Sequence, residues 1–128
     1  MVTTLRRTAL LSAVVGTLLV TGAAVATADS ETCTSDSGCA GRTTFTTANQ
    51  TFTVFDEAGD GHSAVAIYWF ADGNVSHTVW SSGGNGTSVT EQITLPAGNW
   101  VTYKVCLGEG GPKEVMPETC GAAKTEVG

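Results

Sequence analysis

Between residues 43 and 106 the chain repeats one pattern, in which short runs of Thr, Val and aromatic residues are separated by turns rich in Gly, Asn and Asp. Such residues favour strands, and the runs alternate with a period of two rather than a 3.6-residue apolar period. After residue 28 the only leucines are Leu95 and Leu107. The sequence therefore predicts an all-β fold and argues against a helical one.

One run is apolar on both of its alternating sets. Ser63 to Phe70 places Ala64 and Tyr68 on one side and Ile67 and Trp69 on the other, which predicts a central strand. Earlier strands are expected around Phe45 to Thr47 and Phe52 to Val54, and later ones over Val75 to Trp80, Ser88 to Leu95 and Trp100 to Cys106. Tight turns between the last four runs predict a meander, and a final segment over Ala122 to Val127 is expected at a sheet edge.

Six or seven short strands in one domain are typical of a small antiparallel β-sandwich of immunoglobulin-like size, with a small barrel as the alternative. We assign this domain to residues 43–128. Residues 29–42 contain Ser, Thr, Asp and Gly but no large apolar side chain, so they are expected to form a disordered polar arm.

Residues 1–28 have the form of a secretory signal peptide. Arg6 and Arg7 precede a mostly apolar stretch, and Ala26-Thr27-Ala28 gives a small-x-small cleavage pattern. A membrane anchor is the alternative interpretation, but the apolar stretch is interrupted by polar and Gly residues and is not followed by positively charged residues. The mature protein is therefore expected to be secreted and extracellular, with no membrane partner.

The charge of the remaining chain is strongly negative. With the two leader arginines removed, four basic residues stand against twelve acidic ones, a formal net charge of −8. Nucleic acids and anionic membrane surfaces are consequently poor partners for it.

All four cysteines follow the leader, where oxidising conditions are expected: Cys33, Cys39, Cys106 and Cys120. An even number predicts two disulfides, with three possible pairings. We favour the local pairing of Cys33 with Cys39 and Cys106 with Cys120. Zinc sites usually place their cysteines closer together, so no structural metal is expected.

The densest polar cluster, Asp56 to His62, is a poor match to a calcium loop and a good match to an exposed turn. Asp60, His62 and Ser63 adjoin in sequence, but triad members normally come from separate parts of a fold. His77 is expected on the inner face of its strand, as a hydrogen-bonded sheet residue. The sequence thus predicts a protein that is not an enzyme and needs no cofactor.

Two groups of residues are candidates for binding. Trp80 and Trp100 offer large surfaces for a sugar or a protein, although strand parity counted from the sequence is mixed among the tryptophans and Trp69 is expected in the core. The second group lies in the segment bounded by Cys106 and Cys120, where exposed Val115 and Met116 with Glu109 would form a rigid, disulfide-clamped binding feature. A mere connection between edge strands explains this segment equally well.

The motifs Asp60-Gly61-His62-Ser63-Ala64-Val65, Cys106-Leu107-Gly108-Glu109 and Thr119-Cys120-Gly121 resemble those of small exported proteins of Streptomyces and related actinobacteria. The likeness covers about residues 43–123. One role described for such proteins is the adaptor subunit of umbrella toxin particles, which joins a lectin-bearing subunit to the large toxin chain. The resemblance implies a partner among secreted proteins, including subunits of a toxin complex.

The sequence therefore predicts a secreted, noncatalytic protein-binding or adaptor module. Free strand edges and a polar arm would suit β-augmentation, in which main-chain hydrogen bonds supply affinity. Two alternatives stay open: an inhibitor of a secreted protease or amylase, and a small carbohydrate-binding protein.

Overall fold

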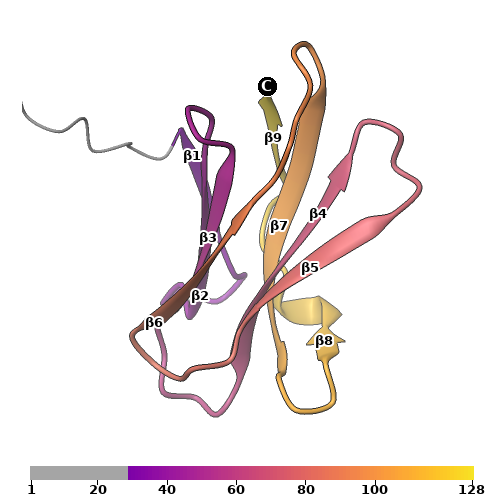
Figure 1. Cartoon of the computed structure of the whole chain (residues 1–128). Helices are drawn as coiled ribbons and strands as arrows, with labels where there is room; N and C mark the ends of the chain where they lie inside the picture. Colours follow the sequence, from indigo (N-terminus) through magenta and orange to yellow (C-terminus); the bar gives the residue numbers. More distant parts are fainter. Residues whose placement is uncertain (1–28) are drawn as a thin grey trace, which may run out of the picture.

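The computed structural model describes residues 29–128, which form a two-layered β-sandwich (Figure 1). The signal peptide expected over residues 1–28 lies outside the described residues. The strands are β1 (Ser30–Cys33), β2 (Gly41–Thr46), β3 (Thr51–Asp56), β4 (Ser63–Phe70), β5 (Ser76–Ser81), β6 (Thr87–Gln92), β7 (Trp100–Glu109), β8 (Glu114–Met116) and β9 (Lys124–Val127). A single turn of 3-10 helix, η1 (Pro117–Thr119), follows β8. The predicted all-β sandwich is confirmed.

The first sheet, sheet A, has the order β1-β2-β3-β6, and the second, sheet B, has the order β5-β4-β7-β8 with β9 also pairing with β7. All pairs are antiparallel. β4 lies between β5 and β7, as its doubly apolar pattern predicts. β9 lies at the edge beyond β7, also as predicted.

The predicted meander is wrong at β6. After β5 the chain crosses to sheet A, where β6 pairs with β3, and β7 returns to pair with β4. The crossing follows a Gly-rich connection in which Gly84 and Gly86 have positive φ angles that other residues rarely adopt. Local alternation identifies a strand but does not say which neighbour it pairs with, so sequence pattern alone favours the nearest one.

The core is an aromatic cluster between the two sheets. Phe45 and Phe52 from sheet A meet Tyr68 and Tyr103 from sheet B, with the Phe45 and Phe52 ring centroids 4.8 Å apart and those of Phe52 and Tyr68 also 4.8 Å apart. Alternate residues of β4 face this cluster, because side chains of a strand point to opposite sides of its sheet. The outer residues of β4 are thereby left for a different role.

The expected polar arm over residues 29–42 is instead part of sheet A. β1 pairs along β2, and Thr32 is buried, with its hydroxyl donating to the Ala122 carbonyl at 2.5 Å. Ser30 and Tyr103 also share a hydrogen bond. An edge strand gains stability from its backbone ladder and needs few apolar side chains, which is why composition was misleading here.

The two disulfides have the favoured local connectivity, Cys33 with Cys39 and Cys106 with Cys120. The first closes the turn between β1 and β2, and the second fixes the segment after η1 to β7. Two disulfides are compatible with an extracellular protein, because oxidising compartments are where they persist.

Residues 29–128 contain no helix of the length and apolar character needed to span a bilayer.

Gly121, next to Cys120 of the second disulfide, lies against the end of β1. A Cβ atom at this position would overlap the backbone carbonyl of Cys33, and the Gly121 N–H donates to the Val105 carbonyl at 3.0 Å. We predict that Gly121→Ala lowers the free energy of unfolding by about 2 to 3 kcal/mol, because backbone must shift to admit the methyl group. Denaturant unfolding measures this.

Gly111→Ala is the matched control. A Cβ at Gly111 meets no atom within 4 Å, and Gly111 has no positive φ. Its free energy of unfolding should stay within about 0.5 kcal/mol of the wild type. Equal stability of the two variants would contradict this account of the Gly121 contact.

Candidate functional site

All three tryptophans lie on the outward face of sheet B, the face turned away from sheet A. Val65 is opposite Trp80 in β5, and Phe70 is opposite Val101 in β7, so Trp69, Trp80 and Trp100 share the side of the sheet that the core residues do not. The expectation of mixed parity is wrong. So is the core placement of Trp69, which is half-buried on this outer face.

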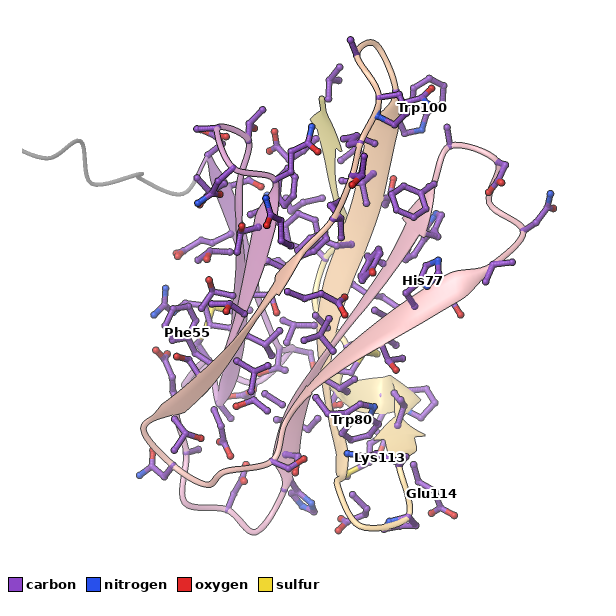
Figure 2. The ribbon with its side chains drawn as sticks, viewed as in Figure 1. Phe55, His77, Trp80, Trp100, Lys113 and Glu114 are labelled. Atoms are coloured by element: carbon purple, nitrogen blue, oxygen red, sulfur yellow. A yellow bond between two sulfur atoms is a disulfide. The ribbon has the colours of Figure 1, made fainter. Side chains whose placement is uncertain are left out.

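Trp80 is held at the β8 end of this face (Figure 2). Its ring reaches Gly108 on β7, where a Cβ atom would approach within 2.8 Å of the indole. Because β4 lies between β5 and β7, the ring crosses β4 and leaves Val65 fully buried. The Lys113 ammonium lies over the Trp80 ring, 5.0 Å from its centroid, in a cation–π contact. This face of the Trp80 ring is therefore covered by Lys113.

Lys113 itself adopts a strained backbone conformation in the turn between β7 and β8. Its φ is +61°, a region that residues other than glycine rarely occupy. Val115 is paired with Gly108 beside the Trp80 ring. Val115 and Met116 are half-buried, so the expectation that they are exposed is wrong, because they belong to a short strand rather than to a free loop.

Trp100 lies at the opposite end of the face and is 46% exposed. Thr102 of β7 is directly opposite Trp69 of β4. Trp100 precedes Thr102 by two residues and Lys104 follows it by two, so both are diagonal neighbours of Trp69. Diagonal neighbours in a sheet have Cα atoms about 7–8 Å apart, within reach of long side chains. Trp69 is therefore flanked by an aromatic and a cationic residue of β7.

Sheet A presents a different outer surface. Its aromatic residue Phe55 is covered by the Arg42 guanidinium, 4.0 Å from the ring centroid. Arg42 is in turn paired with Glu31 and Glu57. The uncovered aromatic surface of the described chain is thus on sheet B.

Glu109 ends β7 opposite Glu114 of β8, with its side chain on the side of sheet B away from Trp80. Its carboxylate contacts His62 Nδ1 at 2.7 Å, next to a cleft of about 380 Å³ at the end of the sandwich. Asp56, Ser63 and Asn85 are among the residues that line this cleft. The Glu109 carboxylate is therefore engaged by His62 and does not form one feature with Val115, contrary to the expectation from the sequence.

Asp56 is the buried acid of this cleft, with 2% of its surface exposed. Burial raises its pKa, and the nearby negative charge of Asp60 acts in the same direction. The hydrogen bond to its carboxylate comes from the Ala58 N–H at 3.4 Å. Across residues 29–128 the structure brings together no group of three or more His, Cys, Asp or Glu side chains suited to hold a metal ion.

His77 lies on the inward side of β5, as predicted, but aromatic rings surround it. Its ring stacks on Tyr68 at 4.9 Å between centroids and meets Phe70 edge-on at 5.6 Å. Burial and the adjacent Glu91 raise the pKa of Tyr68, whose hydroxyl donates to the Glu91 carboxylate at 2.8 Å. This hydrogen bond joins the two sheets on the side of the sandwich where β6 is the edge strand of sheet A and β5 is the edge strand of sheet B.

β5 is the edge strand that lacks the usual protection. The other edges of the described sheets each contain a charged residue: Glu31 in β1, Glu91 in β6, Glu114 in β8, and Lys124 with Glu126 in β9. β5 has no Asp, Glu, Lys, Arg or Pro and pairs regularly with β4 over six residues. Natural sheets commonly use charge, proline or bulges to discourage pairing at a free edge.

Among the candidate residues, the structure brings together Trp80 and Val115 at one end of the outward face and places Trp100 at the other end. Met116, opposite Leu107, and Glu109 lie on the inward side of sheet B. Sequence reasoning missed Lys104 and Lys113. Lys104 alternates in sequence with the apolar residues Val101, Tyr103 and Val105. If these apolar residues face the core, Lys104 must point outward, so the strand pattern alone could have identified it.

Compared with protein families, curated proteins and solved structures, the chain gives no match.

The buried carboxylate of Asp56 gives a pH-dependent prediction. Because its pKa is raised in the folded state, folding favours the protonated form, and the free energy of unfolding falls as pH rises from about 4 through the folded pKa. Asp56→Asn keeps an acceptor for the Ala58 N–H and removes the charge. We predict that it raises the melting temperature at pH 7 by about 4 °C or more, corresponding to about 1 kcal/mol.

Melting curves at pH 7 and pH 3.5 test this prediction. The gain should shrink at the lower pH, where the wild-type carboxyl becomes protonated. Asp29 and Asp36 have lowered pKa values through hydrogen bonds, chiefly with Thr47 and Thr34, and lose their stabilising contribution as pH falls. They are the same in both proteins, so the difference isolates Asp56. A gain that is independent of pH would contradict the assignment.

Proposed function

We propose that this protein is a secreted, noncatalytic adaptor that binds another extracellular protein at the free edge of β5. The observation that carries the proposal is the unprotected β5 edge, in a molecule whose other described edges all carry charge. An extended segment of a partner can add to such an edge through main-chain hydrogen bonds, while its side chains determine specificity.

The surroundings of β5 favour an added strand. Val79 faces the core, and across the opening between the sheets Val89 of β6 is 37% exposed although its position faces inward. Inward side chains of an added strand would find apolar surface there. Glu91, by contrast, points inward from β6 and makes that second edge a poorer place for an apolar strand.

The contacts of the two histidines support a noncatalytic role. His62 is engaged by Glu109, and His77 is packed against Tyr68 and Phe70. Neither makes a hydrogen bond to a Ser, Thr or Tyr hydroxyl that would mark a nucleophile and its base among the described residues.

The resemblance to small exported actinobacterial proteins supports the adaptor role. In an umbrella toxin particle, the adaptor must join a lectin-bearing subunit to a toxin chain. A rigid, disulfide-fixed sandwich with one open edge would suit such a joint, because little order has to be gained on binding. We therefore propose toxin-complex subunits as the partners.

Thr78→Lys tests the edge. Thr78 is exposed near the middle of β5, and a lysine there copies the charge that protects other edges. Tagged protein recovered from the medium of the producing organism should retain at least about tenfold less partner when it carries this change. Quantitative mass spectrometry of the recovered proteins measures the loss.

Thr90→Lys is the matched control, since Thr90 is exposed near the middle of β6. It should retain the partner, and both variants should melt at the wild-type temperature. Equal recovery with Thr78→Lys and wild type would overturn the β5 assignment. Recovery of a secreted hydrolase in place of toxin-complex subunits would favour the inhibitor alternative, and recovery of no companion would overturn the adaptor function.

A further inference from the structure

The outward face of sheet B, next to the β5 edge, carries the three tryptophans and Lys104. We propose that Trp69, Trp100 and Lys104 bind a linear glycan in which alternate sugars carry a carboxylate. This ligand goes beyond the protein partner proposed for β5, since the site uses side chains that project from the sheet rather than backbone at its edge.

The aromatic part of the site is a pair of tryptophans on neighbouring strands. Trp100 is 46% exposed, and Val127, opposite it on β9, is 58% exposed. Trp69 is half-buried and lies diagonally from Trp100, with Cα atoms about 7–8 Å apart. The apolar C–H faces of sugar rings stack on indole rings, and two indoles on a flat sheet fit an extended chain better than a single enclosed sugar.

Hydroxyl groups lie between and beside the tryptophans. The Thr102 and Thr125 hydroxyls contact each other at 2.9 Å, and Thr102 lies directly opposite Trp69. This pattern of aromatic surface interleaved with hydroxyls matches a sugar, which has an apolar ring face and a rim of hydroxyls. A protein hot spot would instead be expected to surround its tryptophans with continuous apolar packing.

The charge of the face selects an acidic glycan. The outward positions of β4, β5, β7 and β9 contain no Asp or Glu, and their charged residue is Lys104. Lys113 adds a second ammonium over Trp80 at the other end. Neither lysine forms an ion pair within the described chain, whereas Arg42 on sheet A is paired twice.

The same charges limit how acidic the ligand can be. After the leader the chain carries a net charge of −8, so a polyanion with a charge on every unit would be repelled by the rest of the molecule. Lys104 and Lys113 are separated along the face. The turn that contains Lys113 lies beside Gly108, and Gly108 is four residues after Lys104 in β7, which is about 13 Å along a strand. Carboxylates on alternate sugars fit this spacing of cations.

The test compares two tetrasaccharides with the purified protein by calorimetric titration. One alternates N-acetylglucosamine with N-acetylmuramic acid and carries a carboxylate on every second sugar. The other, chitotetraose, has the same β-1,4 backbone without carboxylates. We expect the acidic chain to bind at least about tenfold more tightly, since each cation paired with it adds a charge-assisted hydrogen bond.

Three variants assign the site. Trp100→Ala and Lys104→Glu should each weaken binding of the acidic tetrasaccharide by at least about tenfold, and Lys104→Arg should retain it within about threefold. Lys124→Glu on β9, whose side chain lies on the opposite side of the sheet from Lys104, is the charge-matched control and should bind like Lys104→Arg. Melting curves confirm that each variant is folded.

The result is independent of the proposed adaptor function. Thr78→Lys should not weaken glycan binding even where it abolishes partner capture, because Thr78 lies on the outward face, diagonally from Trp69, and the added cation can only attract the acidic glycan. No binding of the acidic tetrasaccharide, equal binding of chitotetraose, or full binding by Trp100→Ala would each overturn the glycan site and leave the β5 proposal standing.

Discussion

The packing of Tyr103 against Phe45 and Phe52 joins the two sheets, and the rest of the molecule depends on this contact. Tyr103 is fully buried, with ring centroids 6.3 Å from Phe45 and 5.2 Å from Phe52, and its hydroxyl bonds to Ser30 of β1. Burial raises its pKa to about 12, so the hydroxyl stays protonated and available as a donor. Because neighbouring residues of β7 point the other way, anchoring Tyr103 also fixes the outward position of Lys104.

The fold could be predicted wherever a signal was local. Alternation identified the strands, the two apolar sets of Ser63–Phe70 identified the central strand, and short loops favoured the correct disulfide pairing. The crossing of β6 to sheet A was missed, because strand pairing depends on where a connection leads. The polar strand β1 was missed as well, since its stability comes from backbone pairing with β2, which composition does not report.

The candidate site was harder to predict because it depends on register between strands. Counting alternation within one run says which residues share a side, but comparing Trp80 with Trp100 requires the pairing of both strands with β4. The error about Trp69 has a related cause. Either apolar set of β4 could face the core, and Ala64 and Ala66 leave room there for the large aromatic rings of sheet A, so Trp69 faces outward.

The two proposed sites lie side by side without competing for the same atoms. A strand added to β5 would use backbone groups in the plane of sheet B, whereas side chains such as Trp69 stand roughly perpendicular to that plane. The added strand would extend the outward face and leave Trp100 and Lys104, on the far side of β4, uncovered. With both proposed sites in use, one small sandwich would hold a protein through a sheet edge and a glycan through a sheet face at the same time.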